Sequence, residues 1–332
     1  MKPRVAVMGA TGAVGSEFLK ILEQREFPMR SLKLLASIRS AGKKLKFAGG
    51  ELTVEELTEK SFDDVDLVLA SAGGSISKQF APAAVKAGAV VVDNTSAFRM
   101  DPQVPLVVPE VNPGDIKKHK GIIANPNCST IIMNVPVWPL HKANPIRRIV
   151  VSTYQAVSGA GAWGLWELDE QMKAYAAGKA IEVKKFPHQI VNNLFSHNSE
   201  IGDDGYNLEE RKMVLETQKI FHAPKMLITA TCVRVPVMRA HSEAINIEFS
   251  KPIGEGEVRE ILAAADGVKI VDDRAANRFP MPIDASGQDD VLVGRIRQDI
   301  SRPDGRGIDM FVAGDQLRKG AALNAVQIAE ML

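Results

Sequence analysis

One of the two cysteines lies in a sequence context that suits a reactive thiol. Cys128 follows an Asn-Pro-Asn tripeptide at residues 125–127 and precedes an apolar stretch at residues 131–135. Asn and Ser are common N-cap residues, so Cys128 is predicted to lie at or near the start of a helix. The positive end of a helix dipole stabilises a thiolate, which makes Cys128 a candidate nucleophile for covalent catalysis. Cys232 lies within an apolar strand pattern and is predicted to be inert.

A nucleophilic thiol needs an acid–base partner, and the chain has six histidines. His241 directly precedes a predicted strand, a position from which a side chain can point into a cleft. Spacing alone does not select His241, because every histidine also fits a surface or capping role. The other five are His119, His141, His188, His197 and His222.

A glycine-rich turn near the N-terminus predicts a dinucleotide site. Residues 9–15 read GATGAVG, after a predicted strand at residues 4–8 and at the start of a predicted helix at residues 14–24. Glycines there allow a tight turn and let the backbone approach a pyrophosphate, which meets the N-terminal amides of the helix. The GxxGxxG spacing differs from the commoner GxGxxG, and the glycines also fit a purely structural role in close helix–strand packing.

The segment after the second predicted strand indicates which nucleotide binds. Sites that prefer NAD usually have an acidic residue at this strand end, where it holds the ribose hydroxyls. Here the strand at residues 31–36 leads into residues 37–44, SIRSAGKK, which contain hydroxyls and cations and no carboxylate. These groups suit a 2′-phosphate, so NADP is the predicted cofactor. The alternative is a solvated basic loop.

The elements that must position these residues follow two patterns. In the first half, short apolar runs alternate with helical stretches, as at residues 65–70 and 89–93, with a helix predicted at 77–87 between them. This pattern is typical of a parallel sheet that is covered on both faces.

A more mixed α+β pattern begins near residue 149. A long loop is predicted between residues 196 and 208, and a terminal helix within residues 315–332, which are rich in Ala, Leu, Ile and Gln. The strands predicted between these landmarks cover residues 148–153, 226–233 and 244–249.

The composition limits the possible partners. The 332 residues are 45% hydrophobic and 24% charged, with a net charge of +1, so no general basic field favours nucleic acid or a membrane surface. No signal segment precedes the first strand, and no apolar run approaches the roughly 20 residues of a membrane span, so a cytoplasmic location is expected. No Cys/His spacing suggests a metal site.

The ordered motifs together resemble the aspartate-β-semialdehyde dehydrogenase family along essentially the whole chain. That family reduces aspartyl phosphate with NADPH on the route to lysine, methionine and threonine. The matching segments, in chain order, are GATGAVG, SAGGSIS, VVDNTSAFR, ANPNCSTI, TYQAVSGAG, LETQKIF, CVRVPVMRAHSEAINIEF and DQLRKGAALNAVQIAE. So many matches in order make the resemblance much more specific than any single motif.

The resemblance implies a fold and a division into domains. A Rossmann-type NADP-binding domain would comprise residues 1–127 and 314–332. An α+β domain at residues 128–313, like that of glyceraldehyde-phosphate dehydrogenase, would carry catalysis and the contact of a homodimer. The small-molecule substrates would be aspartyl phosphate, aspartate semialdehyde and phosphate.

The resemblance also implies roles at the reacting centre. Cys128 would attack the acyl phosphate carbonyl and form a thioester, with His241 as general acid/base and Gln155 orienting the substrate. Arg234 would hold the α-carboxylate in a bidentate pair, and Glu216 would bind the α-ammonium.

Three residues are implied to hold the phosphate, namely Arg99, Lys219 and Asn127. Glu216 and Lys219 are three residues apart on a predicted helix, which is also the spacing of an ordinary surface ion pair. Arg234 also fits a pair with a structural carboxylate, and Arg99 also fits a cap of its own loop.

A further set of residues is implied to contact NADP. Family members commonly have Asn where this chain has Gln316, whose amide reaches one methylene further. The set comprises Gly9, Thr11, Gly12, Ala13, Val14, Gly15, Ser37, Arg39, Ser40, Ser71, Ala72, Gly73, Ser158, Gly159 and Gln316.

Two other functions fit part of this pattern. N-acetyl-γ-glutamyl-phosphate reductases use the same thioester chemistry on a longer, acetylated substrate. A free ammonium needs a carboxylate partner, and Glu216 would supply one, which favours the aspartyl substrate. The second alternative is a cofactor-binding homologue without catalysis, which acts as a sensor or assembly partner. The presence of four residues that such a protein does not need argues against it, namely Cys128, Gln155, Arg234 and His241.

Overall fold

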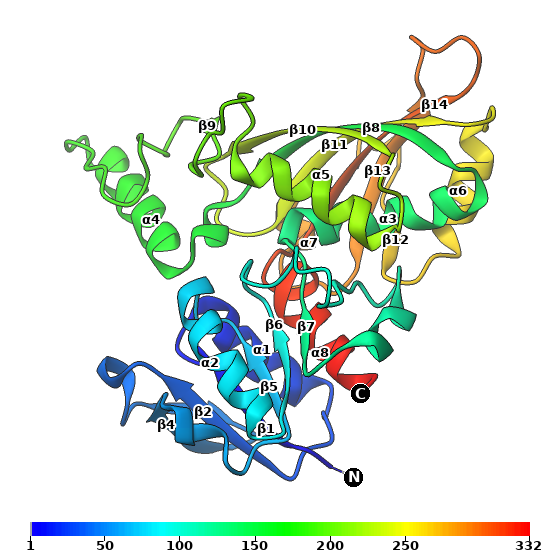
Figure 1. The fold of residues 1–332 in the computed structure, drawn as a ribbon. Coiled ribbons are helices and arrows are strands. Elements are labelled where there is room, and N and C mark those ends of the chain that lie inside the picture. The colour runs from blue at the N-terminus through cyan, green and yellow to red at the C-terminus, as the bar shows by residue number, and fades with distance from the viewer. Residues whose placement is uncertain (1) are drawn as a thin grey trace. The chain divides into compact units, whose positions relative to one another are not determined.

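The chain forms two compact units in a computed structural model that describes residues 2–332 (Figure 1). One unit comprises Met1–Asn127 and Gly320–Leu332, and the other comprises Cys128–Lys319. Each unit has its own seven-stranded sheet with helices packed on it.

Residues 314–319 belong to the second unit, whereas the sequence prediction placed them with the first. Asp315 explains the difference, because its carboxylate accepts hydrogen bonds from Arg239 Nε at 2.7 Å and from the backbone N–H of Gly287 at 2.6 Å. Both partners lie in the second unit.

The sheet of the first unit has the strand order β3-β4-β2-β1-β5-β6-β7. All strands are parallel except β3, which pairs antiparallel with β4 in a hairpin not predicted from the sequence. The strands are β1 (Arg4–Met8), β2 (Ser31–Ala36), β3 (Lys44–Phe47), β4 (Gly50–Glu56), β5 (Leu67–Ala70), β6 (Val90–Asp93) and β7 (Ile122–Ala124).

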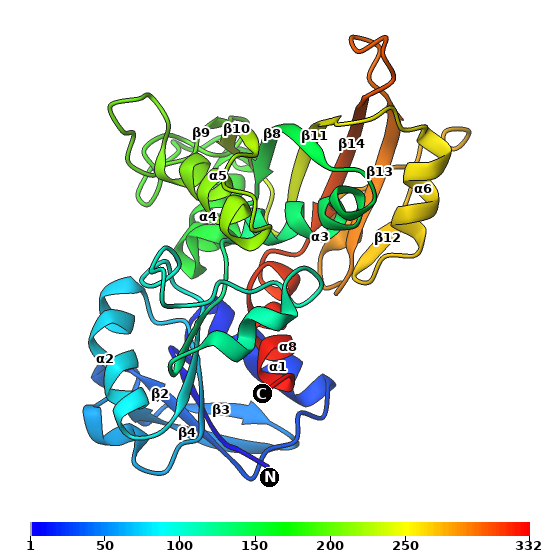
Figure 2. The same ribbon diagram turned by 45° about the vertical axis from the view of Figure 1, so that its right-hand side comes forward.

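Helices cover both faces of this sheet, which is why its central strands are apolar throughout. Val5 and Val7 of β1 point to one face and pack in a core with Phe18 of α1 and with residues of α8, which lies beside α1 in Figure 2. Ala6 points to the opposite face and packs in a core with Phe80 of α2. The helices are α1 (Ala13–Gln24), α2 (Gly74–Lys86) and α8 (Leu323–Glu330).

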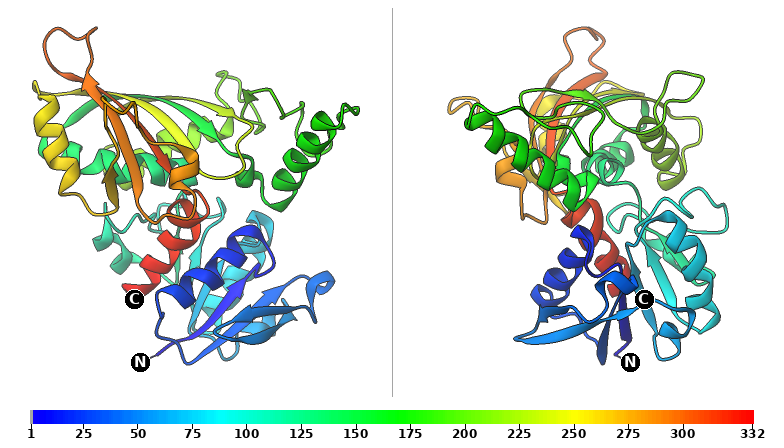
Figure 3. Two further views of the ribbon diagram at one scale, coloured as in Figure 1. Left: turned by 180° about the vertical axis from the view of Figure 1, so that it is seen from behind. Right: turned by 90° about the vertical axis from the view of Figure 1, so that its left-hand side faces the viewer.

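The sheet of the second unit has the order β12-β13-β14-β11-β8-β10-β9 and is mixed. β8 is parallel to β10, and β11 is antiparallel to both β8 and β14. Figure 3 shows the long strands β13 and β14 and the turn that joins them. The strands are β8 (Ile146–Gln155), β9 (Phe195–Ser196), β10 (Leu227–Arg234), β11 (His241–Phe249), β12 (Val268–Ile270), β13 (Val291–Gln298) and β14 (Gly307–Gly314).

Helices α3, α5 and α6 pack on one face of this sheet (Figure 1). α3 approaches β14 so closely that a Cβ at Gly314 would lie 2.9 Å from Ile132, which explains the glycine there. α5 begins with a capping box, in which the side chains of Asn207 and Glu210 each accept the other's backbone N–H at 2.9 Å. The helices are α3 (Cys128–Ala143), α4 (Ala162–Ala176), α5 (Leu208–Ile220), α6 (Glu255–Ala263) and α7 (Pro282–Ala285).

The C-terminal helix predicted within residues 315–332 is present. α8 follows a π-helical turn at Arg318–Ala322 and begins at Leu323. Within residues 2–332, no helix has the length and apolar character to cross a membrane.

Candidate active site

Three buried polar side chains lie at one end of the second sheet. Gln155 is the last residue of β8, Arg234 is the last of β10, and His241 is the first of β11. Arg234 lies opposite Gln155 in the parallel pair, and β11 is antiparallel to β8, so the start of β11 lies beside the end of β8. None of the three is more than 2% exposed.

The thiol of Cys128 joins this cluster. Cys128 is the first residue of α3, as predicted, and it is partly exposed. The next residue, Ser129, accepts a hydrogen bond at its Oγ from Gln155 Nε2 at 2.9 Å. Cys128 also interacts electrostatically with the guanidinium of Arg234. The sheet and the helix thus bring together a thiol, an amide, a guanidinium and an imidazole.

The imidazole of His241 is held in one tautomer. Its Nδ1 accepts a hydrogen bond from the backbone N–H of Ala156 at 3.0 Å. An amide N–H can only donate, so the proton of the neutral ring is on Nε2. Burial, together with the charge of Arg234, lowers the pKa of His241 to about 3. The ring is therefore neutral near pH 7 and presents an N–H at Nε2, which has no hydrogen-bond partner among residues 2–332.

The guanidinium of Arg234 is fixed by two acceptors. Its Nη1 donates to the carbonyl of Ala156 at 2.7 Å, and its Nη2 donates to Nε2 of His197 at 2.8 Å. A Cβ at Gly159 would lie 3.2 Å from Nη1 of Arg234 and 3.3 Å from Nε2 of His241. The absence of a side chain at Gly159 therefore leaves space next to the guanidinium of Arg234 and the imidazole of His241. Arginine keeps its charge in proteins, so this buried group can bind an anion.

Glu209 and Lys212 also belong to the cluster, although they were not predicted from the sequence. Glu209 lies in the first turn of α5, where its Oε1 accepts from Gln155 Nε2 at 3.0 Å and its Oε2 accepts from Lys212 Nζ at 2.9 Å. The carboxylate also interacts electrostatically with Arg234 and His241. The site therefore has an acidic group next to its guanidinium.

The predicted pair Glu216 and Lys219 lies further along the same helix. Glu216 is buried and follows Glu209 by seven residues, about 10 Å along the helix axis. The carboxylate that contacts Gln155 is that of Glu209. Both pairs have the spacing E-x-x-K on one helix face, so the pattern alone does not choose between them. The capping box was the available signal, because it places Glu209 at the helix start.

Two residues predicted to hold phosphate lie in the first unit. Arg99 is buried, and it donates from Nε to the carbonyl of Asn125 at 2.9 Å and from Nη2 to the carbonyl of Asn94 at 3.0 Å. Asn127 is also buried and directly precedes Cys128. Two backbone carbonyls thus hold the guanidinium of Arg99, and one of them belongs to Asn125, three residues before Cys128 in the chain.

The glycine turn fits a bound dinucleotide. Gly9 has a φ of 91°, and a Cβ there would lie 2.5 Å from the carbonyl oxygen of Ser71. A Cβ at Gly15 would collide with the carbonyl oxygen of Gly9. Gly12 is the N-cap of α1 and makes no side-chain cap, and the first turn of α1 contains Ala13 and Val14. The backbone amides at this helix start suit a pyrophosphate.

Other residues predicted to contact NADP follow β2 and β5. Ser37 and Arg39 are exposed after β2, and Thr11 Oγ1 contacts Ser40 Oγ at 3.4 Å. The segment after β5, which holds Ser71, Ala72 and Gly73, lies against Gly9. Lys44, part of the predicted basic loop, instead begins β3 and pairs with Glu51 at 3.5 Å.

Gln316 supports the turn that precedes His241. Its Oε1 accepts from the backbone N–H of Ala240 at 2.8 Å, and its Nε2 donates to Oγ of Ser158. Ala240 has a φ of 70°, a conformation that is costly for a residue other than glycine. The long amide of Gln316 therefore bridges two segments of the second unit and fixes the backbone that delivers the imidazole.

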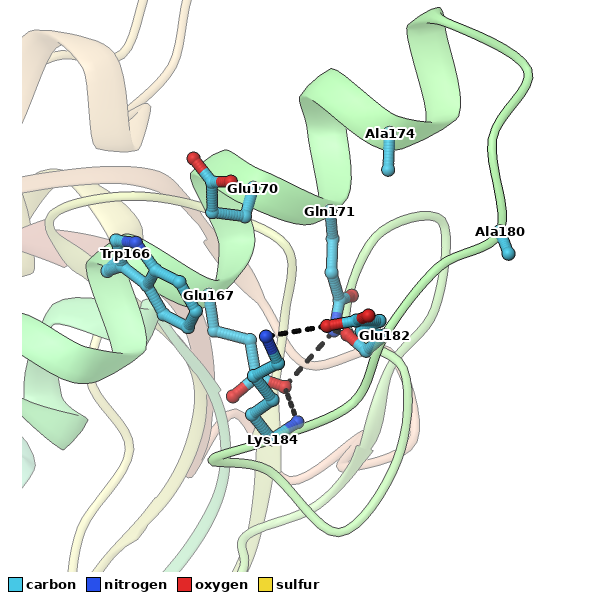
Figure 4. A pocket seen from close by; sticks show the side chains of 8 residues that line it. All are labelled: Trp166, Glu167, Glu170, Gln171, Ala174, Ala180, Glu182 and Lys184. Atoms are coloured by element: carbon cyan, nitrogen blue, oxygen red, sulfur yellow. Dashed lines mark hydrogen bonds and ion pairs between the residues drawn. The ribbon is translucent and has the colours of Figure 1, made fainter.

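A pocket of about 260 Å³ beside α4 contains none of these residues (Figure 4). Glu167 lines the pocket and accepts backbone N–H bonds from Lys184 at 2.7 Å and Phe186 at 3.1 Å, while Lys184 pairs with Glu182. These contacts hold the loop after α4 to the helix, which is a structural role. Within residues 2–332, no group of His, Cys, Asp or Glu side chains is arranged to hold a metal ion.

Comparison with protein families gives two matches that together cover most of the chain. Residues 4–119 match the family described as semialdehyde dehydrogenase, NAD binding domain. Residues 137–319 match the family described as semialdehyde dehydrogenase, dimerisation domain. The fold class predicted from the sequence, a Rossmann-type domain with a second α+β domain, is confirmed.

Individual proteins give the same result. The chain is 58% identical to an aspartate-semialdehyde dehydrogenase of Synechocystis sp., over 99% of this chain and 97% of the other. It matches aspartate semialdehyde dehydrogenase II from Vibrio cholerae, solved complexed with ASA, with a TM-score of 0.97, 47% identity and coverage of 100% and 98%. A structure from Candida albicans with NADP matches with a TM-score of 0.77, 26% identity and coverage of 100% and 98%. The chain belongs to the aspartate-semialdehyde dehydrogenase family.

Proposed function

We propose that this chain reduces L-aspartyl 4-phosphate to L-aspartate 4-semialdehyde with NADPH, reversibly and through a thioester on Cys128, in lysine, methionine and threonine biosynthesis. The observation that carries the proposal is the cluster at the end of the second sheet. There a thiol at a helix start lies with a neutral imidazole, a buried guanidinium and a buried carboxylate. Family membership supports the same chemistry.

Cys128 supplies the nucleophile. A thiolate at the first residue of α3 is stabilised by the positive end of the helix dipole. The sulfur attacks the carbonyl carbon of the acyl phosphate, the bond from that carbon to the phosphate oxygen breaks, and phosphate leaves with the electron pair. The amide of Gln155, held by Ser129 and Glu209, orients the acyl group next to the thiol.

His241 stabilises the charge that develops on the carbonyl oxygen. Each addition to this carbonyl makes its oxygen negative, and a fixed N–H donor in a buried site lowers the energy of that state. Nε2 of His241 carries such an N–H because Nδ1 accepts from Ala156. This role is narrower than general acid/base catalysis, since the occupied Nδ1 keeps Nε2 protonated.

Arg234 and Glu209 recognise the amino-acid end of the substrate. The planar guanidinium of Arg234 suits the α-carboxylate, and the carboxylate of Glu209 suits the α-ammonium. We assign the ammonium to Glu209 and not to Glu216, because Glu209 contacts Gln155 and interacts with Arg234. The ammonium of Lys212, in place of Lys219, is the proposed phosphate ligand of the second unit, and Arg99 and Asn127 stay the proposed phosphate ligands of the first unit.

The glycine turn and the loop after β2 are the proposed NADP site in the first unit. When bound, NADPH supplies the hydride that reduces the thioester to the aldehyde. Arg39 is exposed beside Ser40 and offers a cation to the 2′-phosphate. Arg39→Ala is expected to lower kcat/KM for NADP about tenfold and to leave the value for NAD nearly unchanged. Arg30→Ala, on the same unit, is the control, and equal losses with both nucleotides would contradict the assignment.

We also propose that the chain forms a homodimer through its second unit, Cys128–Lys319, while the first unit, Met1–Asn127 and Gly320–Leu332, binds NADP. The match to a dimerisation domain supports this assembly. Light scattering at assay concentrations should give twice the chain mass, and a clean monomer with full activity would contradict it. A cytoplasmic location stays a prediction.

The competing substrate is N-acetylglutamyl phosphate, which has no free ammonium. Glu209 favours a substrate that has one, because its buried carboxylate lies in the same cluster as Arg234 and has the charge that pairs with an ammonium. The test is NADP reduction with aspartate semialdehyde and phosphate, run beside N-acetylglutamate semialdehyde. Phosphate-dependent activity with the first substrate alone is expected. Activity with only the second would reassign the substrate, and silence with both would favour a non-catalytic homologue.

A further inference from the structure

We propose that His197 is a positioning residue for substrate binding, which holds the Arg234 guanidinium in the orientation that receives the substrate carboxylate. The inference rests on the proposed function, because it takes Arg234 as the partner of that carboxylate. His197 is one of five histidines for which sequence patterns predict no role beyond a surface or capping one. Its contacts in the structure single it out.

The position of His197 is set by the sheet. It follows β9 directly, and its backbone N–H donates to the carbonyl of Cys232 on β10 at 2.8 Å. This contact places its ring beside Arg234, two residues further along β10. Nε2 of His197 then lies 2.8 Å from Nη2 of Arg234.

The contact fixes the protonation of the ring. A guanidinium has donors only, so Nε2 of His197 accepts and the ring proton is on Nδ1. Nδ1 lies 3.1 Å from Oγ of Ser199 and donates to it. His197 and His241 are therefore neutral in opposite tautomers, one as an acceptor toward Arg234 and the other as a donor at Nε2.

Ser199 extends the chain of contacts to the acidic side of the site. Its Oγ also accepts the backbone N–H of Glu209 at 3.2 Å and lies 3.4 Å from Oδ1 of Asn207. One polar chain thus runs from Arg234 through His197 and Ser199 to Glu209. It ties the proposed partner of the substrate carboxylate to the proposed partner of the ammonium.

Burial and the nearby cations keep the ring of His197 neutral, so that its Nε2 can accept a hydrogen bond. Burial lowers the pKa of His197 to about 4, with Arg234 and Lys212 acting in the same direction and Glu209 in the opposite one. The ring of His241, also neutral, is the other titratable group that interacts with it. An imidazolium could not accept from Arg234 and would repel it. The hydrogen bond from Arg234 to His197 is therefore present near pH 7 and is lost as the pH falls through about 4.

Two acceptors on different nitrogens are needed to fix the guanidinium plane. Nη1 is held by the carbonyl of Ala156 and Nη2 by His197, while Nε has no hydrogen-bond partner among residues 2–332. Loss of the imidazole would leave the hydrogen bond to Ala156 and the Phe186 ring, 6.0 Å from the guanidinium carbon, and would let the plane rotate. A bidentate pair with a carboxylate depends on that plane, so binding should weaken without a comparable change at the reacting carbon.

The test replaces the acceptor and measures kcat and KM separately. His197→Leu should raise KM for aspartate semialdehyde about tenfold and change kcat by less than about twofold, as expected for loss of a charge-assisted hydrogen bond. His197→Gln, whose Oε1 can accept from Arg234, should recover most of the loss. With 3-aminopropanal, which lacks the α-carboxylate, wild type and His197→Leu should have equal kcat/KM.

Controls separate the outcomes. His188→Leu makes the same change at an exposed histidine that packs on Phe195 of β9, and it should leave both constants unchanged. Arg234→Gln tests the underlying assignment, and an unchanged KM in that variant would overturn the proposed role of Arg234. A raised KM in Arg234→Gln with no effect of His197→Leu would overturn the role of His197 alone. Equal losses of His197→Leu with both aldehydes would also overturn it, because that result indicates a purely structural role.

Discussion

Strands β8, β10 and β11 of the second sheet carry two sets of polar side chains in different surroundings. At the strand ends, Gln155, Arg234 and His241 gather with the partly exposed thiol of Cys128. Two residues further into the sheet, the same face carries a second, fully buried set. That inner set is Thr153, Cys232 and Glu243.

Burial makes the thiol and the carboxyl of the inner set unreactive. The thiol of Cys232 lies 3.8 Å from the sulfur of Met213, and burial raises its pKa well above the ordinary range. Burial also raises the pKa of Glu243, whose two oxygens have no hydrogen-bond partner among the described residues. The thiol and the carboxyl on the strands are thus kept inert by burial, whereas the thiol of Cys128 and the carboxylate of Glu209 lie at the starts of α3 and α5, next to the polar strand ends.

The two cysteines give the largest expected contrast. Cys128→Ala should lower kcat on the order of 10⁴-fold or more, since it removes the nucleophile. Cys232→Ala should change kcat by less than about twofold and should cost about 1–2 kcal/mol of stability through a small cavity. Steady-state assays of both variants measure kcat, and urea unfolding measures their free energy of unfolding. Comparable losses of activity in the two variants would break the comparison between the strand ends and the interior.

His241 should have the next largest effect. His241→Leu removes the N–H donor at Nε2, and a loss in kcat of about 10²–10³-fold is expected, as for other buried donors to an oxyanion. Because the pKa of His241 is about 3, its ring is neutral throughout the range from about pH 5 to pH 8. The wild-type profile of kcat should therefore show no imidazole ionisation from this residue there. An acid limb near pH 6 that disappears in His241→Leu would contradict the donor role.

Substitution of Glu209 tests whether the site needs a carboxylate to bind the substrate ammonium. Glu209→Gln should lower kcat/KM about 10- to 100-fold, because an uncharged amide cannot pair with the substrate ammonium. Glu216→Gln, the same change seven residues along α5, is the matched comparison and should have the smaller effect. A larger loss in Glu216→Gln would restore the pair that was first predicted from the sequence.

Glu243 should have the smallest effect on activity and a pH-dependent one on stability. Its folded-state pKa is raised, so the folded chain keeps a proton that the unfolded chain loses above about pH 4.5. Wild-type stability should therefore fall relative to Glu243→Gln as the pH rises from about 5 to 8. Urea unfolding at several pH values measures the gap in the free energy of unfolding between wild type and Glu243→Gln. A gap that does not change with pH would mean that Glu243 is ionised in the folded chain.

Much of the fold could be predicted from residue patterns. The strands at Arg4–Met8 and Ser31–Ala36 were predicted with the bounds that the structure has, because continuous apolar runs between glycine-rich turns and helices are a strong signal. The β3–β4 hairpin was missed, since charged residues interrupt the apolar pattern of both strands, and only its first residue, Lys44, lies in the predicted basic loop. Residues 314–319 were assigned to the wrong unit because the contacts of Asp315 are long-range.

The site was only partly predictable. Cys128 was selected by local signals, because a helix start is encoded within a few residues. His197 and Glu209 depend on which strand and helix lie side by side, and no local pattern encodes that. Gln316 was predicted beside the cofactor, and its contacts with Ala240 and Ser158 give it a supporting role in the second unit.

The most direct test of the account is to trap the acyl group on the enzyme. Wild-type protein mixed with aspartate semialdehyde and NADP in the absence of phosphate should form one thioester per chain, because no acceptor can release it. Acid quenching followed by intact-mass and peptide mass spectrometry should find the aspartyl group on the peptide that contains Cys128, and hydroxylamine should remove it. An unmodified chain, or an adduct on the peptide that contains Cys232, would contradict the account.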